Sequence, residues 1–140
     1  MNRYAFVNLS GRPSVFKVVE TDQGVPDIDP NGPWGVWVDI TGNTDVQEGW
    51  HADLINDVWT FTPLTEQEAL DKARGRMQEL LEKAGRWLMF NPLQYKADIG
   101  VASTAEQTLL VAFKEYCIAV SEVINQSGYP RTINWPVAPF

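Results

Sequence analysis

Cysteine and histidine are almost absent from this chain, and their scarcity excludes several classes of site. The single cysteine, Cys117, allows no intramolecular disulfide and no Cys-rich zinc site. The single histidine, His51, allows no cluster of several histidines around a metal. Basic residues are also few, eleven against eighteen acidic ones, which gives a net charge of −7. That balance argues against general binding to nucleic acid, which needs surplus Lys and Arg to replace phosphate counterions.

Long apolar runs are missing as well. The longest, such as residues 109–113, have five residues, far fewer than a helix needs to span a bilayer. Residues 1–4 lead into alternating residues and lack the apolar stretch of a secretory signal. We therefore expect a protein that is soluble in the cytoplasm after its synthesis. A chain of 140 residues with 44% hydrophobic and 21% charged residues is typical of a globular protein of ordinary domain size.

Charge and tryptophan are distributed unevenly along the chain. Residues 1–63 hold nine acidic and three basic residues, a net of −6, whereas residues 64–140 hold nine and eight, a net of −1. Four of the six tryptophans also precede residue 63. This change predicts a boundary near Pro63, between a β-rich N-terminal domain (1–63) and a helical C-terminal region (64–140).

The first part is predicted to form a small antiparallel sheet of about four or five strands. Its β-prone runs are rich in β-branched and aromatic residues and occupy residues 4–9, 14–20, 34–40 and 58–62. Residues 10–13, Ser-Gly-Arg-Pro, supply a turn that pairs the first two runs as a hairpin.

The second part is predicted to be helical. Thr65 and Glu68 have the spacing of a capping box, and the apolar residues that follow recur every three or four positions until Asn91-Pro92, which predicts a helix over about 65–90.

A second capping-box pair, Thr104 and Gln107, predicts a helix over about 104–125. Three prolines then predict an extended tail over residues 128–140. The predicted fold class is therefore α+β, with the sheet first and the helices and tail after it.

One string, Asp27-Ile28-Asp29-Pro30-Asn31-Gly32, matches the start of a calcium-binding EF-hand loop. The match fails at the twelfth position, where Val38 replaces the bidentate glutamate, and the flanking segments are predicted strands instead of helices. Because Asp, Asn, Gly and Pro are also the residues that hairpin loops prefer, we interpret this segment as a turn.

Candidate catalytic groups are few. A Ser-His-Asp triad would have to use His51, near Asp53, and none of the five serines has the glycine pattern of a nucleophile elbow. Cys117 lies on the apolar face of its predicted helix, where a free cysteine acts as a small hydrophobe. Paired carboxylates beside tryptophans are typical of glycosidases, but sugar binding without hydrolysis suits so small a sheet better. We predict no catalytic residue, no metal and no cofactor.

Residues 109–116, Leu-Leu-Val-Ala-Phe-Lys-Glu-Tyr, and residues 133–139, Ile-Asn-Trp-Pro-Val-Ala-Pro, resemble the C-terminal signature of bacteriophage tail fibre assembly proteins. Residues 93–106 are similar to the family's segment before that helix. Gly49-Trp50 and residues 59–63 are similar to the end of its N-terminal β-region. The chain departs from the family at Phe113, where tryptophan is usual, and at Cys117, where a basic residue is usual.

The resemblance implies a chaperone without enzymatic activity that promotes folding and trimerisation of the receptor-binding end of a tail fibre, in the cytoplasm of the bacterial host. The alternative is a virion component that persists at the fibre tip and binds host lipopolysaccharide or another surface glycan. The residues expected to bind the fibre are Phe113, Lys114, Tyr116, Trp135 and Pro136. The candidate polysaccharide-binding residues are Trp34, Trp37 and Trp50.

Overall fold

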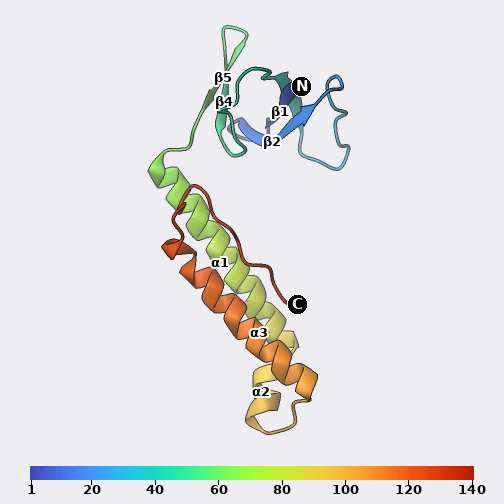
Figure 1. Ribbon diagram of the computed structural model, residues 1–140, viewed down its shortest axis with the longest axis vertical. Coiled ribbons are helices and arrows are strands. Elements are labelled where there is room, and N and C mark those ends of the chain that lie inside the picture. Colours follow the sequence, from blue (N-terminus) through green and yellow to red (C-terminus); the bar gives the residue numbers. More distant parts are fainter. The chain divides into compact units, whose positions relative to one another are not determined.

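A computed structural model describes residues 1–140 and divides them into two compact units, Met1–Thr65 and Glu66–Phe140 (Figure 1). The first unit is a five-stranded antiparallel sheet and the second is helical, so the predicted α+β class is confirmed. The strands are β1 (Asn2–Asn8), β2 (Ser14–Thr21), β3 (Gly35–Asp39), β4 (His51–Ile55) and β5 (Val58–Thr62). The helices are α1 (Glu66–Phe90), α2 (Leu93–Asp98), α3 (Thr104–Ser121) and the 3₁₀ helix η1 (Glu122–Asn125).

The strands of the first unit follow one another in the order β3-β1-β2-β4-β5. The predicted hairpin of β1 and β2 is present and runs from the pair Asn2–Thr21 to the pair Asn8–Ser14. Strand β4 was not among the predicted β-prone runs, although a sheet of four or five strands was predicted. It forms a tight hairpin with β5 across Asn56 and Asp57, whose φ angles of 51° and 61° suit a two-residue turn.

The core of the first unit lies on one face of the sheet. Its buried members are small or β-branched: Ala5, Val7, Val15, Ile40, Val46 and Ala52. Phe6, which lies between Ala5 and Val7 on β1, points to the opposite face because successive strand residues alternate. Phe6 there contacts the ring of Trp37 at a centroid distance of 5.1 Å and that of Phe16 at 6.4 Å. Aromatic residues therefore line the face opposite the aliphatic core.

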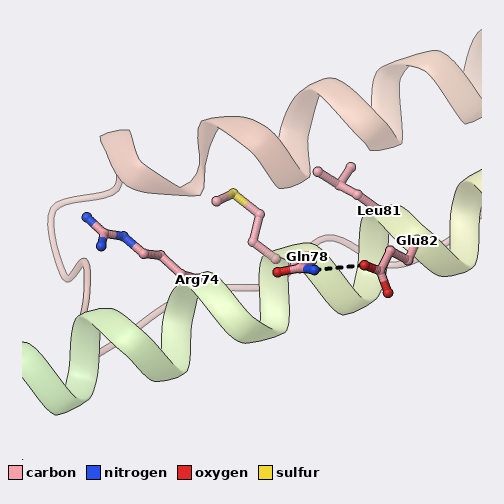
Figure 2. Close-up of a pocket in the computed structure, with 5 residues that line it drawn as sticks. Arg74, Gln78, Leu81 and Glu82 are labelled. Atoms are coloured by element: carbon pink, nitrogen blue, oxygen red, sulfur yellow. Dashed lines mark hydrogen bonds between the residues drawn. The ribbon is translucent and has the colours of Figure 1, made fainter.

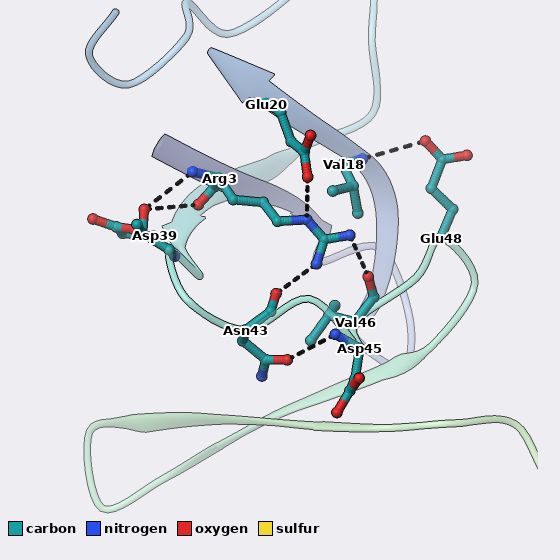
Figure 3. Close-up of polar contacts among 9 residues, drawn as sticks. Arg3, Val18, Glu20, Asp39, Asn43, Asp45, Val46 and Glu48 are labelled. Carbon is teal, nitrogen blue, oxygen red and sulfur yellow. Dashed lines mark hydrogen bonds and ion pairs between the residues drawn. The ribbon is translucent and has the colours of Figure 1, made fainter. Parts of the chain in front are cut away.

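Arg3 fastens the loop after β3 to the sheet (Figure 3). Its Nη2 donates to the carbonyl oxygen of Val46 at 3.0 Å, its Nη1 donates to that of Asn43, and its Nε lies 3.2 Å from Oε1 of Glu20. The Val18 amide of β2 donates to Oε1 of Glu48, from the same loop, at 3.2 Å. Arg3 therefore bonds two carbonyls of a loop that has no regular secondary structure.

In the second unit α1 and α3 lie side by side as a helical hairpin (Figure 1). Helix α1 ends at Phe90 and α3 ends at Ser121, where η1 continues to Asn125, beside predicted ranges of about 65–90 and 104–125. The second capping box is not where we predicted it. Ser103 and Glu106 form it instead of Thr104 and Gln107: the Glu106 amide donates to Ser103 Oγ at 3.1 Å and the Ser103 amide to Glu106 Oε1 at 3.2 Å. Both pairs fit the sequence pattern, and the extended backbone at Ser103 decides between them.

The chain after η1 returns along the helical hairpin (Figure 1). Residues 133–140 form neither helix nor strand. The Gln126 side chain holds the start of this segment: its Nε2 donates to the Asn134 carbonyl at 2.9 Å and its Oε1 accepts from the Asn134 amide at 2.8 Å. No helix in the structure has both the length and the apolar character needed to cross a membrane.

Candidate functional site

Four aromatic side chains from three segments meet in the helical unit. Trp87 of α1 stacks on Phe140 with centroids 4.6 Å apart, and Phe113 of α3 lies 5.9 Å from both of these rings. Tyr116 meets Phe140 edge to face at 5.8 Å. We call these four residues the aromatic cluster. It joins both helices to the returning chain.

The aromatic cluster belongs to a core and presents no reactive group. Phe113 and Tyr116 are 7% and 6% exposed and pack with Ala84 and Val120. Burial raises the pKa of the Tyr116 phenol and that of the neighbouring Cys117 thiol. The thiol therefore stays protonated at neutral pH, which agrees with our interpretation of Cys117 as a small hydrophobe.

The five residues expected to bind the fibre are not all on the surface. Phe113 and Tyr116 are buried, Trp135 and Pro136 are half-buried, and Lys114 is exposed. Phe140, which the sequence reasoning did not single out, lies against the rings of Phe113 and Tyr116.

The three candidate polysaccharide-binding tryptophans are not brought together. Trp34 is 72% exposed. Trp37 lies against Phe6 on one face of the sheet, and Trp50 packs against the aliphatic core on the other. Of the three, only Trp34 presents most of its side chain to solvent.

The Asp27–Gly32 segment forms a turn. The Asp29 carboxylate accepts the Asn31 amide at 2.9 Å, and the Asp29 carbonyl accepts the Gly32 amide at 3.0 Å. No group of three or more His, Cys, Asp or Glu side chains in the structure could hold a metal ion.

Exposed apolar side chains are frequent at the end of α1 and along the connection to α3. Met89, Phe90, Tyr95, Ile99 and Val101 are all 61–78% exposed. We call these five residues the turn surface. Sequence reasoning missed it, although a signal existed: residues 87–90, Trp-Leu-Met-Phe, are too many consecutive apolar residues for one face of a helix. Large exposed apolar clusters mark interaction sites.

A second feature of the helical unit is an open groove of about 510 Å³ along α1. Met77 and Leu81 line it together with Arg74, Gln78 and Glu82 (Figure 2). Gln78 donates to Glu82 at 2.8 Å across one helical turn. Met77 and Leu81 also pack against the core of the hairpin, so the groove borders the core instead of enclosing a cavity.

An ion pair holds the connection that carries the turn surface. Lys96 of α2 donates to Glu106 Oε2 at 2.6 Å, and Glu106 is also the partner of the N-cap residue Ser103 in the capping box of α3. The pKa of Glu106 is lowered, chiefly by the hydrogen bond from Lys96 and then by that from the Ser103 amide. The interaction therefore links α2 to the first turn of α3 most strongly while Glu106 is ionised.

This link predicts a pH-dependent contribution to stability. Because the pKa of Glu106 is lower in the folded chain, ionised Glu106 stabilises the fold above its unfolded pKa of about 4.3, and this contribution disappears as the pH falls through the folded pKa. We expect Glu106→Gln to lower the melting temperature at pH 7 and to match the unmodified chain in strong acid. Thermal unfolding at a series of pH values measures this. Glu115→Gln, on the exposed side of α3, is the control, and a Glu106→Gln deficit that persists unchanged in acid would contradict the assignment.

The model of one protein family, described as Caudovirales tail fibre assembly protein, lambda gpK, matches residues 6–140. The chain belongs to this family. The predicted resemblance is thereby confirmed over both units, well beyond the C-terminal segments that suggested it. Searches of curated proteins and of solved structures found no match.

Membership of the tail fibre assembly family gives the exposed surfaces their context. The protein has a role in phage tail fibre assembly, which implies interaction with tail fibre proteins. Such a role is structural or that of a chaperone, and it calls for surfaces that hold another chain. In the helical unit, the turn surface is exposed and apolar, and the groove on α1 is open to solvent.

Proposed function

We propose that this protein promotes the folding and trimerisation of the receptor-binding end of a tail fibre, as a non-catalytic chaperone. The observation that carries the proposal is the match of residues 6–140 to the tail fibre assembly family. A fibre built from intertwined strands exposes apolar edges until its three chains are in register. A chaperone for it needs an adhesive surface and no reactive group.

The turn surface is our proposed fibre-binding site. Its five side chains are large and apolar, and only Lys96 and Asp98, of opposite sign, carry charge between residues 87 and 105. Such a surface binds apolar partners with little charge to desolvate. Interfaces bury about 800 Å² on each side, and five aromatic or aliphatic side chains supply a substantial part of that area.

Two of the residues predicted to bind the fibre fit this proposal only indirectly. Phe113 and Tyr116 are buried, so we propose that they support the hairpin instead of touching the fibre. Lys114, Trp135 and Pro136 have exposed atoms and remain proposed contacts. Trp135→Ala tests the tail separately from the turn surface.

Co-expression with the cognate tail fibre tests the function. We expect a soluble trimeric fibre with the unmodified chain and an insoluble fibre without it. Phe90→Ser combined with Ile99→Ser should reduce the yield of soluble trimer about tenfold or more, because interface anchors dominate binding. Val111→Ser combined with Ile118→Ser removes two other exposed side chains, each 55% exposed on α3, and serves as the matched control.

The outcomes separate the function from the site. A fibre that is equally soluble and trimeric without this protein would overturn the proposed function. A fibre that needs the protein but tolerates the Phe90→Ser and Ile99→Ser pair would overturn the turn surface alone. Circular dichroism and thermal unfolding of each variant confirm that it folds.

A persistent, polysaccharide-binding tip of the virion is the second candidate. The exposure of Trp34, at 72%, favours it, because sugars stack on accessible aromatic faces. Detection of the chain in purified phage particles would support this candidate, and its absence from them would count against it.

A further inference from the structure

Strand β5 is the last strand of the sheet and has one unpaired edge. It pairs with β4 alone, from Val58 opposite Ile55 to Thr62 opposite His51. In an antiparallel pair, residues bond to the partner strand at alternate positions and point their amides and carbonyls outward at the others. The free edge of β5 therefore carries backbone groups from every second residue.

The register identifies these residues as Trp59 and Phe61. A two-residue turn places the hydrogen-bonded pair directly beside it, at Ile55 and Val58, so the next bonded pairs are Asp53–Thr60 and His51–Thr62. In the remaining pairs, Leu54–Trp59 and Ala52–Phe61, the backbone amides and carbonyls point away from the partner strand. The Ala52 amide agrees with this, because it donates to the Pro13 carbonyl at 3.1 Å on the side of β4 away from β5. Phe61 lies across from Ala52, and Trp59 lies two residues before it.

The β5 edge lacks the features that protect edge strands from pairing. Its sequence, Val-Trp-Thr-Phe-Thr, holds no charge, no proline and no glycine. The other unpaired stretches differ from β5 in a covered amide or in composition, since β3 begins with glycine and ends with a charged residue. The Val18 amide of β2 is bonded to Glu48, and β3 ends on Asp39, with the indole of its Trp37 bonded to the Asp27 carbonyl.

We propose that β5 pairs antiparallel with β5 of a second copy of this chain, around a two-fold axis at Thr60. In this register Trp59 lies opposite Phe61 of the partner subunit, and Phe61 opposite the partner's Trp59. Each of the two pairs exchanges two N–H···O=C bonds, so the four outward groups of each copy are all satisfied. The sheet then continues from one copy into the other.

The side chains match in the same register. Trp59 and Phe61 both pack against the aliphatic core of the unit, so they lie on one face, and each meets an aromatic residue across the interface. On the other face Thr60 meets Thr60 of the partner subunit in a close, non-hydrogen-bonded pair. No charge faces a like charge within the paired segments. A second copy is therefore a complementary occupant of this edge in both backbone and side chains.

The centre of the proposed interface supplies the experiment. Lysine at position 60 would face lysine directly across the axis, and glutamate would face glutamate, whereas lysine opposite glutamate is attractive. Sedimentation equilibrium of the unmodified full chain should show a mass that rises with concentration from 15.8 kDa toward twice that value. Thr60→Lys and Thr60→Glu should each weaken the dimer about tenfold or more. An equimolar mixture of the two variants should restore it.

Controls make the outcome decisive. Val36→Lys places the same charge on the opposite edge strand, β3, and should leave the dimer intact. Circular dichroism checks that each variant folds, and the mixture is a second check because unfolded chains would not recover the dimer mass. A chain that stays at 15.8 kDa at every concentration, or a mixture no heavier than its components, would overturn the proposal. If the unmodified chain is monomeric and Thr60→Lys still lowers the solubility of the co-expressed fibre, the edge pairs with a strand of the fibre instead of a second copy.

Discussion

Replacing Gly35 with alanine is expected to detach β3 from the sheet. A methyl group at this position would lie 2.1 Å from the carbonyl oxygen of Val7 and 2.9 Å from two ring atoms of Phe6. Val7 is buried in β1, the strand to which β3 pairs, so its carbonyl cannot move without breaking that pairing. Overpacking costs about 1–3 kcal/mol where side chains can adjust, and a clash with backbone should cost about 3 kcal/mol or more.

Urea unfolding with a free energy extrapolated to water measures this loss. Gly24→Ala is the matched control, because nothing lies within 4 Å of a methyl group there. Since β3 carries Trp37, which contacts Phe6, the fluorescence of the native state should also change in the Gly35 variant. Equal stability of the Gly35→Ala and Gly24→Ala variants would contradict the close packing of β3 on β1.

Local sequence patterns predicted most of the secondary structure. The helices over 66–90 and 104–121 follow apolar spacing and capping residues, and the hairpin of β1 and β2 follows a turn between two β-prone runs. Strand β4 was not predicted because only one of its five residues, Ile55, is β-branched or aromatic. Its pairing partners, above all β5, make it a strand. The second capping box was predicted one residue too late because two hydroxyl residues, Ser103 and Thr104, are adjacent and both fit the pattern.

Exposure at the candidate site could not be predicted from the same patterns. Helix α3 carries apolar residues on more than one side, and the sequence does not say which side packs on α1. Phe113 and Tyr116 face the core, whereas Val111 and Ile118 are each 55% exposed. The C-terminal segment contributes to this burial, because Phe140 packs against the rings of Phe113 and Tyr116, which are far from it in sequence. Contacts at such separation leave no periodic signal.

The uneven charge of the chain corresponds to a division of interaction chemistry between the two units. The sheet carries a net of −6, yet its terminal strand β5 is uncharged, so the acidic residues do not protect that edge. The helical unit carries a net of −1, and the stretch that holds the turn surface carries only two charges, Lys96 and Asp98. The proposed self-pairing and the proposed fibre contact therefore use different units and different forces, backbone hydrogen bonds in one and apolar contact in the other.

Phe113→Ala should be the most destabilising truncation in the helical unit. The side chain is 7% exposed and touches the rings of Trp87 and Phe140, so its removal leaves a cavity between both helices and the tail. Truncation of a buried phenylalanine costs about 3–5 kcal/mol. Phe140→Ala should cost less, about 1–2 kcal/mol, because that side chain remains 40% exposed. Ile118→Ala, on the exposed side of the same helix, is the control.

The comparison also decides what Phe113 does for the fibre. If Phe113 acts through the core, its loss should lower the free energy of unfolding, measured in urea, and reduce fibre solubility only as far as the chaperone unfolds. Lower temperature during co-expression should then rescue the fibre. A Phe113→Ala chain that keeps its full stability but no longer yields soluble fibre would show a direct contact. That result would contradict the burial of Phe113 and restore the role that the sequence resemblance implies.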